Sequence, residues 1–476
     1  MTSLTDKRFH FSGVGGSGMA PLAQLVALLG AQVTGSDRNL DRGLNLPVFD
    51  ALLEAGVTLV PQDGSGVVPG LDALVHSTAV EPTNPDYVRA GELDIPRVRR
   101  GSFLAQLASE RRAIAIAGTS GKSTVTAMVA HILLEAGVDP SFLGGGAAVD
   151  LLGSVPPGSL RVGGSDWLVI ETDESDGSVA EFAPAIAVLT NLTRDHKEVD
   201  VTREMFARLL VQTKDRAVVH VGDPALRDVP RPGHLSFLTV GVEGDPHWFT
   251  PDLLARSVRL TPNGVRFEIG GAAAKVPFPG ILTVQNAAIA IAAAHAAGIP
   301  VAEAARALER FGGVRRRLER VGAADGIDVF DDFAHNPVKI RMAVEALRPV
   351  ASLWICYQPH GYGPTRFFRD ELIGTFRDVL RPQDHLLLAP IYDAGGTAER
   401  TIRSDDIAEP LRSAGLHATV VASREEAMRA LIEGAHGGDR VVVMGARDDT
   451  LPSFARDILA GLLARSGEPA AGRTQR

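Results

Sequence analysis

A glycine-rich segment that ends in a lysine and two hydroxyl residues offers the clearest chemistry in this sequence. It spans residues 118–124, between an apolar strand pattern and a helix pattern. At such a junction backbone N–H groups bind phosphate oxygens, a lysine reaches the terminal phosphates and a hydroxyl ligates Mg²⁺. Ile116 replaces the first glycine of the common phosphate-loop pattern, so the match is a variant. The predicted ATP ligands are Gly118, Thr119, Ser120, Gly121, Lys122, Ser123 and Thr124.

A second glycine-rich segment, with the pattern G-x-G-x-x-G, covers residues 13–18 between another strand and helix. Asp37 follows near the end of the next predicted strand. A diphosphate at a helix N-terminus, with an acidic residue near a ribose, has this pattern. Alone it would also fit a nicotinamide-dependent dehydrogenase or a tight turn. Two nucleotide-type loops in succession make the tight turn the weaker interpretation.

Carboxylates and a histidine follow two predicted strands near the lysine loop. The acidic run 171–176 follows a strand at 167–170, and His196 follows a strand at 185–189. Parallel strands of an open sheet bring their carboxyl ends to one edge, where ligands bind. We therefore predict that Ser123, Glu171 and His196 ligate Mg²⁺, which prefers oxygen ligands. Lys122, Glu171 and His196 are the predicted catalytic residues, although a solvated acidic turn and a structural histidine are the ordinary alternatives.

Strand and helix patterns alternate through the chain and predict an α/β fold with parallel sheets. Residues 246–279 differ, since alternating apolar residues between prolines and glycines favour antiparallel strands there. An alanine-rich helix is expected at 286–297. We predict three domains in series. They are a Rossmann-like domain at 1–110, a P-loop-type domain at 111–320 and a Rossmann-like domain at 321–476.

Composition limits the classes of function. The 476 residues favour several domains, and a net charge of -9 argues against a general nucleic-acid binder. No stretch has the length and apolarity of a membrane span, and the N-terminus lacks the features of a signal peptide. The single cysteine, Cys356, excludes an intramolecular disulfide and fits a reducing compartment. We expect a soluble cytoplasmic monomer or homodimer that binds neither nucleic acid nor membrane.

Together these motifs resemble the Mur ligase family over nearly the whole chain. Besides the two loops and the acidic run, the resemblance is carried by Asn191 to His196, Arg316-Arg317 before Leu318-Glu319, Asp331 to Pro337, and Tyr357 to Arg366. It implies UDP-substrate binding, ATP binding and amino-acid binding in the three successive domains. The N-terminal loop would then hold a UDP diphosphate rather than a dinucleotide.

The resemblance also implies individual roles. Asn286, Arg317 and Asp332 would contact ATP, and His335, His360 and Arg366 would face the acceptor. The UDP-linked substrate would contact Gly13, Gly15, Gly16, Ser17, Gly18, Asp37 and Ser77.

The implied reaction is an ATP-dependent, Mg²⁺-dependent joining of a carboxylate to an amine through an acyl phosphate. It would add L-alanine, or another amino acid, to UDP-N-acetylmuramate in peptidoglycan synthesis. Attachment of a recycled tripeptide stays open within the family, because several positions depart from its usual pattern: Ser120, Leu282, Thr283, Gly361, Gly363, Pro364 and Arg447. Outside it, the alternatives are an NAD-dependent oxidoreductase and an ATP-dependent binding or switch protein.

Overall fold

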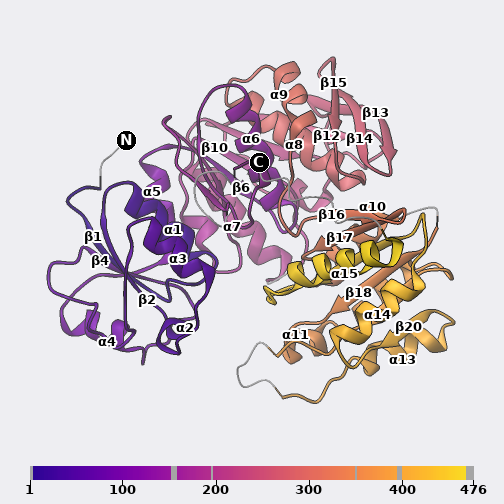
Figure 1. The fold of residues 1–476 in the computed structure, drawn as a ribbon. Coiled ribbons are helices and arrows are strands. Elements are labelled where there is room, and N and C mark those ends of the chain that lie inside the picture. Colours follow the sequence, from indigo (N-terminus) through magenta and orange to yellow (C-terminus); the bar gives the residue numbers. More distant parts are fainter. Residues whose placement is uncertain (1–3, 152–157, 195–196, 349–350, 394–398, 468–476) are drawn as a thin grey trace. The chain divides into compact units, whose positions relative to one another are not determined.

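The computed structural model describes residues 4–151, 158–194, 197–348, 351–393 and 399–467 (Figure 1). The chain forms two compact units. One comprises residues 1–259, 265–277 and 283–313, and the other comprises 260–264, 278–282 and 314–476. The predicted α/β class is confirmed, with one small sheet and one large sheet in the first unit and a third sheet in the second. The predicted domain boundaries after residues 110 and 320 stay predictions.

The small sheet of the first unit is parallel, with the strand order β3-β2-β1-β4-β5. Its strands are β1 Arg8–Ser12, β2 Gln32–Ser36, β3 Thr58–Val60, β4 Ala73–His76 and β5 Arg97–Arg99. The helices are α1 Met19–Leu28, α2 Arg38–Asp41, α3 Pro47–Glu54, α4 Pro85–Glu92 and α5 Arg100–Ser109. Asn84 caps α4 ahead of Pro85, a favoured helix start.

The large sheet has the order β15-β14-β13-β12-β11-β10-β6-β9-β7-β8. Its strands are β6 Arg112–Ala117, β7 Ser141–Leu143, β8 Leu160–Arg161, β9 Trp167–Glu171, β10 Ile186–Leu189, β11 Arg216–His220, β12 Ser236–Val242, β13 Leu253–Thr261, β14 Gly264–Ile269 and β15 Ala272–Val276. The helices of this region are α6 Lys122–Glu135, α7 Val199–Gln212, α8 Ile281–Ala296 and α9 Val301–Ala307. Strand β6 lies between β10 and β9 and pairs with both in parallel, so the ends of all three strands share one edge.

Two expectations for this region need correction. The strands after residue 246 are not uniformly antiparallel, because β14 pairs antiparallel with β15 whereas β13 pairs parallel with β12. Alternation of apolar residues reveals which face is buried but not the direction of a strand. Helix α8 begins at Ile281, five positions before the expected start at 286. Gly280, with φ +92°, has a non-helical backbone conformation immediately before this helix.

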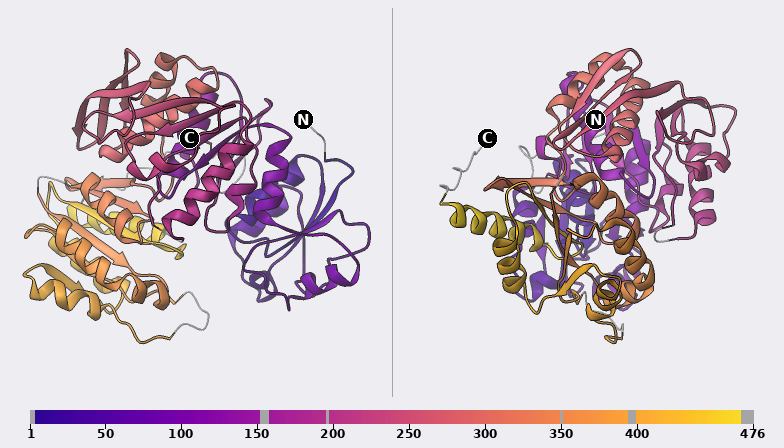
Figure 2. Two further views of the ribbon diagram at one scale, coloured as in Figure 1. Left: turned by 180° about the vertical axis from the view of Figure 1, so that it is seen from behind. Right: turned by 90° about the vertical axis from the view of Figure 1, so that its right-hand side faces the viewer.

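The second unit, mostly orange to yellow in Figure 2, holds a six-stranded sheet. Its strand order is β16-β17-β21-β18-β19-β20. Only β16 pairs antiparallel with its neighbour. The strands are β16 Glu319–Ala324, β17 Ile327–Asp332, β18 Leu353–Gln358, β19 His385–Leu388, β20 His417–Val420 and β21 Arg440–Gly445. The helices are α10 Pro337–Leu347, α11 Tyr362–Phe367, α12 Arg369–Val379, α13 Asp405–Ser413, α14 Arg424–Gly434 and α15 Leu451–Ser466.

Apolar cores cover both faces of this third sheet. Cys356 lies in β18 and is 2% exposed, as expected for a core strand residue. Across the described residues, no helix combines the length and the apolar character needed to cross a bilayer.

Candidate active site

The lysine loop joins the end of β6 to the start of α6, as predicted. Gly121 is the N-cap of α6 in the left-handed conformation, with φ 78°, and no side chain caps this helix. A Cβ on Gly118 would overlap Thr190 Oγ1, and one on Gly121 would lie 2.5 Å from Asn286 Oδ1. Both positions therefore require glycine, and the N-terminus of α6 is shaped to accept an anion. The same contact places Asn286, a predicted ATP ligand, beside the loop.

Asn191, just beyond β10, holds the loop in shape. Its Oδ1 accepts hydrogen bonds from the backbone N–H groups of Thr119 at 3.1 Å and Ser120 at 2.8 Å. Its Nδ2 donates to Ser120 O at 2.9 Å, and Thr190 Oγ1 donates to the same oxygen at 2.9 Å. The loop is therefore fixed by an amide side chain from a neighbouring strand of the same sheet.

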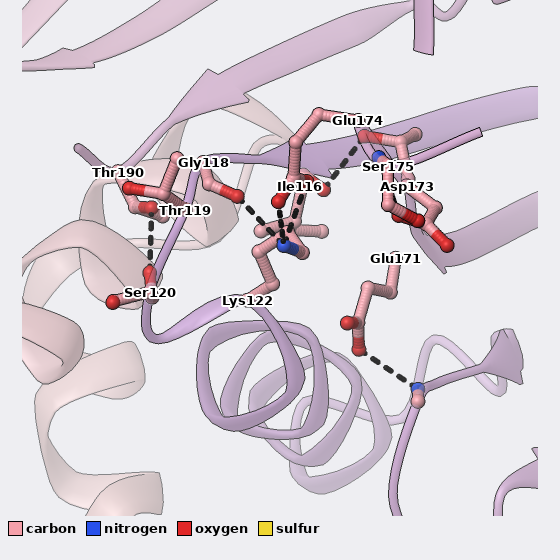
Figure 3. A network of polar contacts seen from close by, with 12 residues as sticks. Ile116, Gly118, Thr119, Ser120, Lys122, Glu171, Asp173, Glu174, Ser175 and Thr190 are labelled. Carbon is pink, nitrogen blue, oxygen red and sulfur yellow. Dashed lines mark hydrogen bonds and ion pairs between the residues drawn. The ribbon is translucent and has the colours of Figure 1, made fainter. Parts of the chain in front are cut away.

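Lys122 lies over the loop and is held by a carboxylate (Figure 3). Its Nζ donates to Gly118 O at 2.7 Å and to both oxygens of Glu174, at 2.8 and 3.0 Å. Burial alone would lower the pKa of Lys122, but the carboxylates of Glu174 and Glu171 outweigh it and raise that pKa. Burial also raises the pKa of Glu174, although Lys122 opposes the shift. The pair holds the Lys122 ammonium against the loop that precedes α6.

Glu171 is the last residue of β9 and lies on the other side of Lys122 from Glu174 in Figure 3. One of its oxygens, Oε2, accepts a hydrogen bond from Gly145 N at 2.8 Å. Ser123, in the first turn of α6, is 6% exposed. A carboxylate and a hydroxyl beside a phosphate cradle fit Mg²⁺, which needs few protein ligands because it keeps waters and phosphate oxygens. The third predicted ligand, His196, lies outside the described residues.

The N-terminal loop follows β1 and is fixed largely by hydrogen bonds that its backbone N–H groups donate. The N–H groups of Gly13 and Val14 donate to Ser36 O, at 2.8 and 2.9 Å, and that of Gly16 donates to Gly13 O at 3.1 Å. Gly15 N donates to Asp37 Oδ2 at 3.0 Å, so Asp37 lies against the loop. This leaves the loop with few backbone donors for a ligand.

The other residues predicted to bind the UDP-linked substrate lie within the N-terminal loop or near it. The turn that follows Ser77 reaches the loop, since a Cβ on Gly13 would lie 3.8 Å from Val80 Cγ2. Ser77 Oγ accepts from Ala79 N at 3.3 Å inside that turn. Ser17 and Gly18 precede α1, for which Gly18 is the N-cap.

A buried polar cluster supports this first loop from below. Asp86 Oδ2 accepts from Ser12 Oγ at 2.9 Å and from Ser36 Oγ at 2.5 Å, and Gly64 N donates to its other oxygen at 3.1 Å. His10 Nε2 lies 3.4 Å from the same carboxylate, and both side chains are fully buried. Burial would raise the pKa of Asp86, but its hydrogen bonds with His10 and Ser36 lower it. The Asp86 carboxylate is thus charged, and both of its oxygens accept hydrogen bonds.

Two of the predicted ATP contacts, Arg317 and Asp332, belong to the second unit. Asp332, at the end of β17, is buried and accepts hydrogen bonds from Leu318 N and Ala334 N, both at 2.7 Å. The guanidinium of Arg317 lies 4.9 Å from the centre of the Phe333 ring. These bonds tie Asp332 to the segment that carries Arg317.

Of the predicted acceptor residues, the structure brings two histidines together. The rings of His335 and His360 pack edge to face, with centroids 5.0 Å apart. Tyr357 supports the first of them by donating to His335 O at 3.2 Å. Arg366, on α11, pairs with Glu399 at 3.4 Å.

The prediction of site residues missed Glu174 and the supporting role of Asn191. Glu174 is one of four carboxylates in a six-residue run, and nothing in the spacing distinguishes it from its neighbours. Asn191 carried a signal, since it follows a buried strand next to the loop strand. Within the described residues, no three His, Cys, Asp or Glu side chains converge as a metal cluster.

Comparison with known proteins gives consistent matches. Family models match as "Mur ligase family, catalytic domain" over residues 8–112, "Mur ligase middle domain" over 116–294 and "Mur ligase, glutamate ligase domain" over 316–447. The UDP-N-acetylmuramate–L-alanine ligase of Burkholderia ambifaria is 35% identical over 458 residues, covering 92% of this chain and 95% of the relative. The enzyme of that name from Brucella ovis is 31% identical, covering 94% and 96%.

Solved structures show the same fold. The UDP-N-acetylmuramate–alanine ligase of Thermotoga maritima has a TM-score of 0.76 at 24% identity, with 96% of this chain and 99% of that chain covered. A murein peptide ligase from Psychrobacter arcticus has a TM-score of 0.66 at 24% identity, with 98% and 100% covered.

Proposed function

Because this chain belongs to the Mur ligase family, we propose that it joins a UDP-linked sugar carboxylate to an amine in peptidoglycan synthesis, at the expense of ATP. The carboxylate we propose is that of UDP-N-acetylmuramate and the amine that of L-alanine, the substrates named for relatives of up to 35% identity. An oxidoreductase is not supported, since the matched families are ligases. A nucleotide-dependent switch does not explain relatives that are named as ligases over almost their full length.

The observation that carries this proposal is the pair Lys122–Glu174 at the phosphate loop. A carboxylate is a poor electrophile, so it must be activated before an amine can attack it. Transfer of the γ-phosphoryl group to a carboxylate oxygen gives an acyl phosphate and ADP. Negative charge spreads over the phosphoryl oxygens in this step, and a buried ammonium with the α6 N-terminus stabilises it.

Lys122 changes partners when the nucleotide binds. In the structure its Nζ contacts Glu174 and Gly118 O, and a terminal phosphate would take the place of these acceptors. Mg²⁺, held by Glu171 and Ser123 with His196 as a third candidate, would neutralise phosphate charge and orient the transferred group. Asn191 keeps the loop rigid, so little reorganisation is needed when charge develops. Water must be excluded, since it would hydrolyse the acyl phosphate.

The second step forms the amide bond. The amine nitrogen attacks the carbonyl carbon of the acyl phosphate, inorganic phosphate leaves with the bonding electron pair, and the nitrogen loses a proton. We propose that His335 and His360 lie at the acceptor side, because their imidazoles can accept that proton or bind the carboxylate of an amino acid. Asn286, Arg317 and Asp332 are proposed ATP contacts.

Phosphate release, screened over UDP-sugars paired with single amino acids and with the recycled tripeptide, tests the proposal. We expect turnover with UDP-N-acetylmuramate and L-alanine that depends on ATP, on Mg²⁺ and on the presence of both the carboxylate and the amine. Turnover with the tripeptide but not with L-alanine would make the tripeptide the acceptor. Phosphate release that ignored both carboxylate and amine would contradict the proposal. We further propose a cytoplasmic monomer or homodimer, since ATP and UDP-linked substrates are cytoplasmic.

A further inference from the structure

Arg100 stands between the N-terminal loop and the acidic run 171–176. It is the first residue of α5 and follows directly on β5. A Cβ on Gly18, the N-cap of α1, would lie 3.3 Å from both Cδ and Nη1 of Arg100. The guanidinium therefore lies against the end of the N-terminal loop, where an anion would approach α1.

The opposite side of the same guanidinium is anchored to the acidic run of the ATP site. Arg100 Nη2 donates to Asp176 Oδ2 at 3.0 Å and lies 3.6 Å from Asp173 Oδ2. Gly101 permits this approach, because a Cβ there would overlap Ser178. The Arg100 side chain is 21% exposed, so its planar fork is held in place yet still reaches solvent.

The N-terminal loop needs such a cation. Four of its N–H groups are already bonded within the protein, those of Gly13, Val14, Gly15 and Gly16. It also lacks a lysine of its own, whereas the ATP loop contains Lys122. A diphosphate at this loop would therefore find little positive charge in the loop itself, and Arg100 is placed to supply it.

We propose that Arg100 binds the diphosphate of the UDP-linked substrate through its Nη1 side while Nη2 stays on Asp176. This inference rests on the proposed function and names a binding and positioning residue for it. Glu174, which holds Lys122, lies in the chain between Asp173 and Asp176. One short acidic segment thus anchors the cation of each loop. Arg100 thereby sets the place of the substrate carboxylate relative to the phosphoryl group it must attack.

The test compares four variants with the wild-type chain. Arg100→Gln removes the charge, Arg100→Lys keeps the charge without the fork, and Asp176→Asn removes the anchor of the guanidinium. Arg99→Gln is the matched control, because Arg99 is the adjacent arginine and pairs with Glu181 at 3.1 Å. Calorimetry gives the Kd for UDP, steady-state kinetics give KM and kcat with each substrate, and thermal unfolding reports the fold.

We expect Arg100→Gln to weaken UDP binding about 10- to 100-fold, the usual effect of one charge-assisted contact, and to leave the KM for ATP near the wild-type value. Arg100→Lys should lose less. Asp176→Asn should lower kcat more than it weakens UDP binding, because the charge remains while its position is lost. Arg99→Gln should bind and turn over as the wild type does.

Equal UDP affinity in Arg100→Gln and the wild type would overturn the inference while leaving the proposed ligase intact. An equal loss of UDP affinity in Arg99→Gln would overturn it as well. So would an Arg100→Gln variant that has a lower thermal midpoint and binds every substrate more weakly by the same factor. Wild-type chain that bound no UDP at all would contradict the proposed function, and this inference with it.

Discussion

The two glycine-rich loops of the first unit share a strand–loop–helix arrangement but differ in where their charge lies. The loop at 118–124 carries its own lysine and is shaped by an amide from a neighbouring strand. The N–H groups of the loop at 13–18 donate mostly to Ser36 O and Asp37, and the cation near this loop comes from a separate helix. The first arrangement suits phosphoryl transfer, because a cation inside the loop can follow the migrating charge. The second suits holding a diphosphate still.

Replacing Lys122 with alanine should have the largest effect on activity, since it leaves the lysine loop without a cation of its own, as in the N-terminal loop. We expect phosphate release to fall by about 10³-fold or more, because charge in the transferred group loses its main protein partner. The measurement is ADP release that depends on both carboxylate and amine.

Glu174 would be left buried without a cation in that variant. Adding Glu174→Gln should therefore recover thermal stability but not activity. Near-normal turnover of Lys122→Ala, with or without the second change, would show that the role assigned to the lysine is wrong.

Asn191→Ala should loosen the ATP loop without changing its charge. Ser120 N loses its acceptor, while Thr119 N and Ser120 O each lose one hydrogen bond and keep another, to Asn191 O and from Thr190 Oγ1. We expect the KM for ATP to rise about 10-fold or more, in line with the loss of several hydrogen bonds. UDP binding, measured by calorimetry, should stay near the wild-type value. If UDP affinity fell in parallel, the two loops would not be separately supported.

Asp86→Asn is the corresponding change beneath the N-terminal loop. An asparagine has one side-chain oxygen in place of two, so either Gly64 N or the hydroxyls of Ser12 and Ser36 lose their acceptor. We expect UDP binding to weaken by up to about 10-fold and the free energy of unfolding to fall by about 1–3 kcal/mol. The KM for ATP serves as the internal control, and a change confined to that KM would contradict the division of roles.

Helix α6 also differs from α1 in carrying a buried histidine, His131. Its Nδ1 lies 3.0 Å from Asp150 Oδ2 and its Nε2 lies 2.9 Å from Ala307 O, so both nitrogens face acceptors. Burial lowers the pKa of His131, but Asp150 and Ala307 outweigh this and raise it. A raised folded-state pKa means stability that is complete below the ordinary pKa and is lost as pH rises through the folded value.

His131→Gln should therefore cost about 1 kcal/mol of stability near pH 6 and less near pH 9. Thermal unfolding of both proteins across this range measures the difference. A gap that widened toward high pH would show that the histidine is neutral in the folded chain.

The sequence allowed the α/β class, the order of the sheets and both loops to be predicted, because each depends on local patterns. The apolar run before Gly118 and the Gly-Lys-Ser sequence together specify a strand, a turn and a helix start. The direction of β13 could not be predicted, since alternation of apolar residues marks the buried face and not the strand direction. The start of α8 was missed because the helix was placed only on its alanine-rich part, which follows Ile281. The selection of Glu174 by Lys122 and the reach of Arg100 to Gly18 depend on tertiary packing, which spacing does not reveal.

In the proposed reaction, a carboxylate oxygen attacks ATP at the lysine loop before any amine reacts. Transfer of oxygen-18 from the labelled carboxylate of UDP-N-acetylmuramate into inorganic phosphate measures this step directly. We expect one labelled oxygen in the phosphate for each amide bond formed, and loss of the oxygen-18 transfer in Lys122→Ala. Amide formation that left the released phosphate unlabelled would contradict it.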